Sequence, residues 1–209
     1  VEDISGANEE SEYAKAKNYL RNRVTEIHKE AVKKKDKALF SRAADIYALY
    51  MRGFLAKPRD DKERAELSQI RIYRSDALLA SSRDADAIPE LEAALADDKS
   101  DPKLRREAGT SLLNILIKRI DAFRSKGKDN DAYKQAKKQF IADSEAFEDA
   151  FPKDNLVPEL HYKKARLAVE ESGPEGLSSD AKSDLRELIE KYPERNESIE
   201  AAHDMVVDA

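Results

Sequence analysis

Residues 13–31 read YAKAKNYLRNRVTEIHKEA, and the spacing of the apolar side chains in this stretch decides the fold class. Six of these side chains recur at steps of three and four residues: Tyr13, Ala16, Leu20, Val24, Ile27 and Ala31. Such steps place side chains on one face of an α-helix, and charged residues fill most of the positions between them. The stretch therefore predicts an amphipathic helix, which we expect to extend from about residue 9 to 35.

The same spacing continues along the rest of the chain, interrupted by prolines and by helix-capping residues. Asp60, with Glu63 three residues on, predicts a capping box at the start of one helix. We predict about nine helices, near residues 9–35, 37–56, 60–80, 86–97, 102–126, 130–151, 156–171, 178–192 and 196–207. Pro89 is expected in the first turn of its helix, where its missing N–H is not needed. No segment alternates with period two for long enough to predict a strand. The sequence thus predicts an all-α fold in one domain, 1–209, with residues 1–8 disordered.

The composition is that of a folded protein with a very polar surface. Charged residues make up 39% of the chain, against about 25% in an average protein, while hydrophobic residues still reach 40%. A disordered chain would lack those hydrophobic residues. There is no cysteine, which excludes disulfides and cysteine-ligated metals. No run approaches the roughly 18 apolar residues that a membrane span needs, so we expect none.

Charge is distributed unevenly along the chain. Residues 84–101 carry a net charge of −6, residues 103–128 a net charge of +6, and residues 141–209 a net charge of −10. Adjacent blocks of opposite sign neutralise each other when neighbouring helices pack. The overall charge of −5 argues against a nucleic-acid partner. The acidic C-terminal third favours basic partners.

Two similar junctions indicate an internal repeat. Phe151-Pro152-Lys153-Asp154-Asn155 is followed 41 residues later by Tyr192-Pro193-Glu194-Arg195-Asn196, and each junction lies between two predicted helices. With the other prolines, this spacing indicates a helical hairpin of roughly 40 to 50 residues. A single hairpin cannot bury its apolar stripe alone, so hairpins of this kind stack into an array.

The chain resembles the tetratricopeptide repeat family. In residues 87–95, AIPELEAAL, the small and large side chains fall as in the second helix of such a repeat. The Phe151-Pro152 and Tyr192-Pro193 junctions are similar to those of bacterial cell-envelope members. The resemblance implies a right-handed α-solenoid of about four stacked hairpins that binds proteins without catalysis. The repeat spacing exceeds the family's usual period of about 34 residues, so a different α-solenoid and a closed helical bundle remain alternative folds.

We find no pattern that predicts catalysis, a cofactor or a metal site. His28, His161 and His203 are far apart, and none has a second histidine or a cysteine at ligand spacing. The six glycines are scattered, so there is no glycine-rich loop to hold a phosphate. We therefore expect a protein that is not an enzyme.

Two arginines in the helix near 102–126 are candidate partner-binding residues. At 100° per residue, Arg105 and Arg119 share a face with apolar side chains. Buried arginines must be paired, and the acidic helix at 86–97 would be the structural partner. On an open groove, the same arginines would instead bind a partner's carboxylates.

Tyr47 and Tyr50 are the second pair of candidates, because they form an aromatic cluster with Phe54 at helical spacing. Aromatic residues at helical spacing usually belong to the hydrophobic core. The alternative is that they line a groove that receives an apolar side chain of a peptide.

These observations favour a scaffold or adaptor that binds a protein or peptide partner along a helical groove. The alternative is a structural helical bundle that acts through self-association. The junctions indicate a periplasmic or outer-membrane-associated protein of a bacterium, with a cytoplasmic location as the alternative. Because the chain starts at Val1 without an initiator methionine, we expect an upstream segment that could carry an export signal or lipid anchor.

Overall fold

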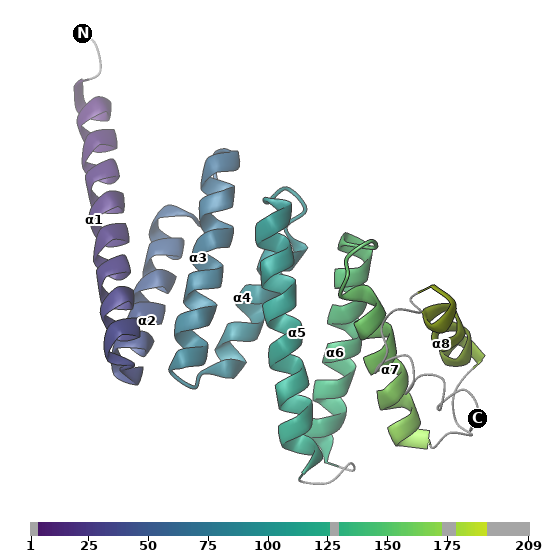
Figure 1. Ribbon diagram of the computed structural model, residues 1–209. Helices are drawn as coiled ribbons and strands as arrows, with labels where there is room; N and C mark the ends of the chain where they lie inside the picture. The colour runs from purple at the N-terminus through teal and green to yellow at the C-terminus, as the bar shows by residue number, and fades with distance from the viewer. Residues whose placement is uncertain (1–3, 126–129, 173–178, 192–209) are drawn as a thin grey trace. The chain divides into compact units, whose positions relative to one another are not determined.

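The computed structural model describes residues 4–125, 130–172 and 179–191, and these residues form α-helices and no strand (Figure 1). The helices are α1 (Ile4–Lys34), α2 (Lys37–Phe54), α3 (Asp61–Ala80), α4 (Asp84–Ala96), α5 (Pro102–Arg124), α6 (Asp131–Ala150), α7 (Val157–Ser172) and α8 (Ser179–Lys191). The all-α class is confirmed. Within the described ranges there are eight helices rather than about nine, since the predicted helix at 196–207 lies outside them.

Two helix starts differ from the prediction. Helix α1 begins at Ile4, so residues 4–8, for which disorder was the expectation, are helical. Residues 4–8 continue no apolar stripe, and Gly6 is a poor helix former, so neither periodicity nor helix propensity predicts this turn. Helix α4 begins at Asp84, so Pro89 lies past the first turn rather than in it.

The connection between α1 and α2 shows how the chain folds back on itself. Lys35 has a φ of +52°, the left-handed conformation that commonly ends a helix. The carboxylate of Asp36 then accepts hydrogen bonds from the backbone N–H groups of Ala38 and Leu39, at 2.8 and 3.2 Å. These bonds satisfy donors that the first turn of α2 would leave unpaired. A connection this short makes α1 and α2 antiparallel neighbours.

The chain divides into two compact units, residues 1–115 and 116–209, with the boundary inside α5. That the chain forms a single helical-repeat domain stays a prediction.

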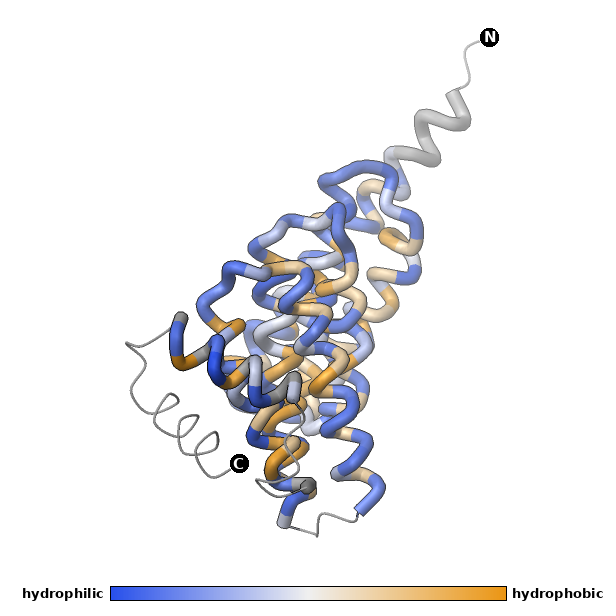
Figure 2. Tube along the Cα trace, turned by 90° about the vertical axis from the view of Figure 1, so that its right-hand side faces the viewer, coloured by the Kyte–Doolittle hydropathy of each residue, from blue (hydrophilic) through white to orange (hydrophobic). Residues whose placement is uncertain are grey.

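In the first unit, α1 packs against α2, α2 against α3, and α3 against α4. Along these helices hydrophobic and hydrophilic residues alternate with the helical period (Figure 2). The hydrophobic ones meet in a core whose buried members are Val24, Ile27, Ala43, Ala44, Tyr47, Tyr50, Leu55, Leu67, Ile70, Ala77, Leu78 and Ala87. The stripe predicted for residues 13–31 therefore supplies core residues in its C-terminal half.

Contacts also join helices that are not consecutive. The ammonium of Lys17 on α1 lies 3.0 Å from a carboxylate oxygen of Glu63 and 3.1 Å from one of Glu66, both on α3. We call Lys17, Glu63 and Glu66 the carboxylate clamp. A second such contact joins α3 to the start of α5. The buried hydroxyl of Ser100, just before α5, donates a hydrogen bond to the hydroxyl of Ser68 on α3 at 2.8 Å. The clamp holds α1 beside α3, which positions the pocket described below.

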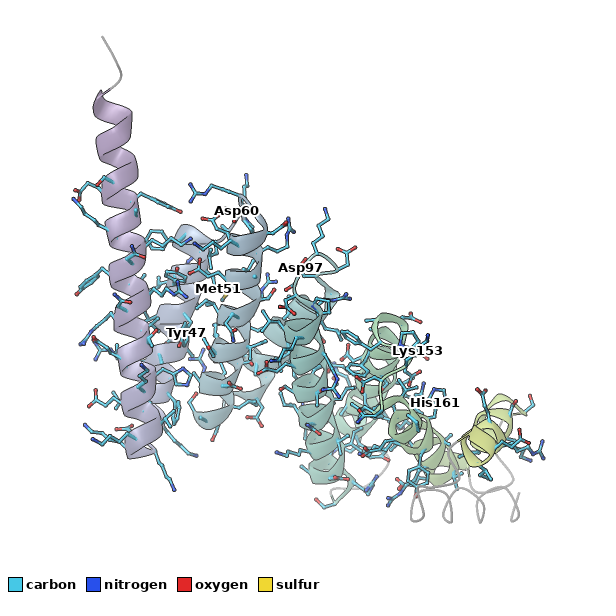
Figure 3. All side chains as sticks on the ribbon, turned by 45° about the horizontal axis from the view of Figure 1, so that its top comes forward. Tyr47, Met51, Asp60, Asp97, Lys153 and His161 are labelled. Carbon is cyan, nitrogen blue, oxygen red and sulfur yellow. The ribbon has the colours of Figure 1, made fainter. Side chains whose placement is uncertain are left out.

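The start of α3 confirms the predicted capping pair. The side chain of Asp60 accepts a hydrogen bond from the backbone N–H of Glu63 at 2.7 Å (Asp60 is labelled in Figure 3). The carboxylate of Glu63 accepts in return from the backbone N–H of Arg59 at 2.9 Å and from its guanidinium at 2.7 Å. Glu63 is therefore both a capping residue and a member of the clamp.

In the second unit, α6 packs against α7, and α7 packs against α8. Its largest fully buried side chains are Leu116, Phe140, Phe147, Leu160 and Leu185. At the predicted junction, α6 ends at Ala150, and the N–H of Phe151 donates to the carbonyl of Phe147 at 2.8 Å. The ring of Phe151 packs on that of Phe147, with centroids 5.2 Å apart.

Candidate functional site

The first unit contains a pocket of about 410 Å³ between α1 and α3, with α2 beneath it. Its lining residues are Thr25, His28, Lys29 and Val32 from α1, Tyr47 from α2, and Tyr73 and Asp76 from α3. The α1 residues follow one another at steps of three, one and three, and the two α3 residues are three apart, so each set lies on one helix face. The pocket thus combines side chains from three helices, of which α1 and α3 are also joined by the clamp.

The walls of the pocket are aromatic. The ring centroid of His28 lies 5.7 Å from that of Tyr47 and 6.4 Å from that of Tyr73, and the two tyrosine rings are 6.3 Å apart. Tyr47 forms the floor and is only 2% exposed (labelled in Figure 3), whereas Tyr73 is 42% exposed at the rim. We call His28, Tyr47 and Tyr73 the aromatic cage.

A hydrogen bond fixes the histidine of the cage. The Nδ1 atom of His28 lies 3.0 Å from the hydroxyl of Tyr47. Burial lowers the pKa of His28 below its usual 6.5, because a partly enclosed imidazolium loses hydration. Burial likewise raises the pKa of the Tyr47 hydroxyl. Both groups are therefore neutral at pH 7.

The carboxylate of Asp76 is the acidic group of the pocket. The residue is open to solvent on one side, but protein atoms surround the carboxyl on the others. This desolvation, and then the nearby charge of Glu107, raise the pKa of Asp76 above its usual 3.8. Among the described residues, none makes a hydrogen bond or ion pair with it.

Lys29 is the basic group of the pocket and is exposed. Within the described part of the chain its ammonium makes no ion pair with Asp76 and no contact with the rings of the cage. The pocket therefore offers ring faces and a carboxylate that the protein does not itself neutralise.

Of the two predicted tyrosines, only Tyr47 reaches this pocket. Tyr50 is 0% exposed, and its hydroxyl donates to the carboxylate of Glu66 at 2.5 Å. It therefore belongs to the core and has no surface to offer a partner, so we do not propose it as a binding residue. Helical spacing put both residues on one stripe and could not tell which one a neighbouring helix would cover.

The two predicted arginines are half-buried and have partners. The Nε of Arg105, in the first unit, donates to the carbonyl of Leu95 near the end of α4 at 3.0 Å. Arg105 thus contacts the helix expected to be its structural partner, through a backbone carbonyl. The guanidinium of Arg119, in the second unit, lies 5.9 Å from the ring centroid of Phe123. That either arginine binds a partner stays a prediction.

Sequence reasoning did not combine His28, Tyr73 and Asp76 into a site. The available signals were the position of His28 at the edge of one apolar stripe and of Tyr73 on another. What joins them is the tertiary packing, since α1 and α3 both pack against α2.

In two further pockets the carboxylates are already paired. In the first unit, one of about 370 Å³ includes Arg71 and Arg74, which both form ion pairs with Glu90, and the exposed Arg52. In the second unit, one of about 260 Å³ includes Arg124 and Arg166, which both pair with Glu170. Neither offers a carboxylate without an ionic partner, as Asp76 does in the pocket between α1 and α3.

Among the described residues, no group of three or more His, Cys, Asp or Glu side chains is arranged to hold a metal ion. None of the described helices has both the length and the apolar character needed to cross a membrane. No family model, no curated protein and no solved structure matches this chain.

Proposed function

We propose that the chain is a non-catalytic scaffold or adaptor that binds a protein or peptide partner along a groove of stacked helical hairpins. The resemblance to tetratricopeptide repeats supports this proposal. The similarity of the Phe-Pro and Tyr-Pro junctions to those of bacterial cell-envelope members supports a role in a bacterial envelope assembly. The proposed binding surface is the α1–α3 side of the first unit.

The contacts within the first unit support a stacked arrangement. Helices α1, α2, α3 and α4 pack in order, while Lys17 joins α1 to α3 and Ser68 joins α3 to the start of α5. In a stack of hairpins, each helix typically contacts the helix that follows it and also the second helix after it. Alternate helices then line one side of the stack. In such a stack α1, α3 and the first half of α5 would form the groove side.

The observation that carries the proposal is the pocket with its exposed apolar rim. Val32 is 57% exposed and Tyr73 42% exposed, and they lie on opposite sides of a pocket large enough for a side chain. Interface hot spots are commonly aromatic residues around pockets that receive a partner's anchor. A partner docking here would remove apolar surface from water without having to open the core.

Self-association is the second candidate, favoured by Tyr19, which is 71% exposed on α1. A large exposed ring contributes apolar area to an interface between copies of the chain. Sedimentation of the pure protein separates the two candidates, because the scaffold does not require a dimer.

A random peptide library displayed on phage tests the proposed function. We expect selected peptides to bind the wild-type protein and to lose at least about tenfold in affinity for Tyr73→Ala, since truncating a hot-spot residue costs about 2 kcal/mol or more. Val32→Ser is expected to weaken binding in the same direction. Fluorescence anisotropy of labelled peptides gives the dissociation constants.

Tyr19→Ala is the matched control, because it removes the same side chain from an exposed position on α1 that is not part of the pocket. Its affinity for the peptides should equal that of the wild type. Equal binding by wild type and Tyr73→Ala, or a library that yields no ligand, contradicts the proposal.

A further inference from the structure

The aromatic cage and Asp76 form a constellation that goes beyond a generic apolar pocket. Rings from α1, α2 and α3 lie with centroids 5.7 to 6.4 Å apart, and the carboxylate of Asp76 lines the same pocket. The faces of aromatic rings carry negative potential and attract cations, most strongly where water is displaced. A carboxylate beside such rings adds a full negative charge.

Charge complementarity identifies the kind of group that fits. A neutral side chain would leave the partly desolvated carboxylate of Asp76 without a partner, which is costly. An anion would meet the charges of both Asp76 and Glu107, which are close enough to interact. A cation would instead satisfy the carboxylate and lie against the rings.

The protein leaves this place open to a cation from outside. Neutral His28 adds no positive charge at pH 7, since burial lowers its pKa. Lys29 lines the pocket but contacts neither Asp76 nor the rings among the described residues. Its charge opposes an incoming cation, so its removal should improve binding.

Resting on the proposed function, we infer that the partner is a basic polypeptide segment that places a lysine or arginine side chain in this pocket, against His28 and Tyr73 and beside Asp76. The rings provide the walls and the carboxylate the counter-charge. A partner of this chemistry uses both features at once.

The test uses small probes followed by chemical shifts of the His28 and Tyr73 rings. Butylammonium stands for lysine, propylguanidinium for arginine, and 1-butanol is the neutral equivalent of butylammonium. We expect saturable binding of at least one cation and at least about fivefold weaker binding by butanol, a difference of about 1 kcal/mol, which is the upper end for an exposed ion pair. Whichever cation binds more tightly indicates the partner's residue.

Two variants should move the affinity in opposite directions. Asp76→Asn keeps the shape of the side chain and should weaken cation binding at least about fivefold, whereas Lys29→Met should strengthen it about twofold. Asp61→Asn, an exposed position at the start of α3 away from the pocket, is the matched control and should behave as the wild type. Equal affinities for butanol and the cations, or an unchanged affinity in Asp76→Asn, would overturn the inference.

The phage-selected peptides separate this inference from the proposed function. Peptides that require Tyr73 but share no basic residue would overturn the cation site and leave the scaffold function standing. Cation binding without any peptide ligand would sustain the cation site and overturn the scaffold function. A shared lysine or arginine whose replacement by norleucine costs at least about fivefold in affinity supports both.

Discussion

Replacing Tyr47 by alanine lowers the free energy of unfolding of the first unit by about 3–5 kcal/mol, the range for truncating a large buried aromatic side chain. The residue is 2% exposed and lies against His28 and Tyr73. Its loss would leave a void beneath the pocket and remove the contacts that hold the other two rings. Denaturant unfolding measures the change, and amide hydrogen exchange in α1, α2 and α3 assigns it to this unit.

Tyr47→Phe is the control that separates the ring from the hydroxyl. It removes only the hydrogen bond to His28, so we expect a loss of about 0.5–1.5 kcal/mol. Because the ring face remains, cation binding should persist. A loss below about 1 kcal/mol in Tyr47→Ala would mean that the residue does not support the pocket as described.

Replacing Glu63 by alanine lowers the free energy of unfolding by about 2–3 kcal/mol, since its carboxylate is buried and accepts several charged hydrogen bonds. It bonds Arg59 at 2.7 Å and Lys17 at 3.0 Å, and without it both lose a partner. Loss of the bond to Lys17 also loosens α1 from α3. Denaturant unfolding of the variant measures the cost, with Glu12→Ala as control. Glu12 pairs with Lys15 on the surface, so its loss should change stability by at most about 0.5 kcal/mol.

The same residue gives the protein a defined acid sensitivity. Hydrogen bonds from Arg59, and then from Lys17, lower the pKa of Glu63 from 4.5 to about 2. The unfolded chain therefore takes up a proton at higher pH than the folded one, so the contribution of Glu63 is complete above pH 4.5. It is lost as the pH falls from 4.5 towards 2. Glu63→Gln, which cannot ionise, should show a flatter pH profile in this window, and an unchanged profile contradicts this assignment.

The helices were largely predictable because their determinants are local. Spacing of three and four residues marked each helix face, and Asp60 with Glu63 marked the start of α3, as the structure confirms. The first turn of α1 escaped prediction because neither apolar spacing nor helix propensity marks residues 4–8, which include Gly6. The predicted start of α4 was too late, because Pro89 was expected in the first turn of its helix. In the structure the helix begins at Asp84, five residues before the proline.

The candidate site was predictable only in part, because its geometry depends on long-range packing. Tyr47 and Tyr50 are equivalent in the sequence pattern, and only the positions of α1 and α3 make one a pocket floor and the other a core residue with Glu66 as acceptor. Asp76 looked like one of many surface acids. Its distinctive property, a carboxylate beside aromatic rings without an ionic partner, exists only in the folded unit.

A crystal structure of the protein with a phage-selected peptide tests the central claim most directly. We predict a peptide side chain inside the α1–α3 pocket, in contact with Tyr73 and Val32 and with its cationic group beside Asp76. A peptide bound to a surface that includes none of these residues would contradict the account.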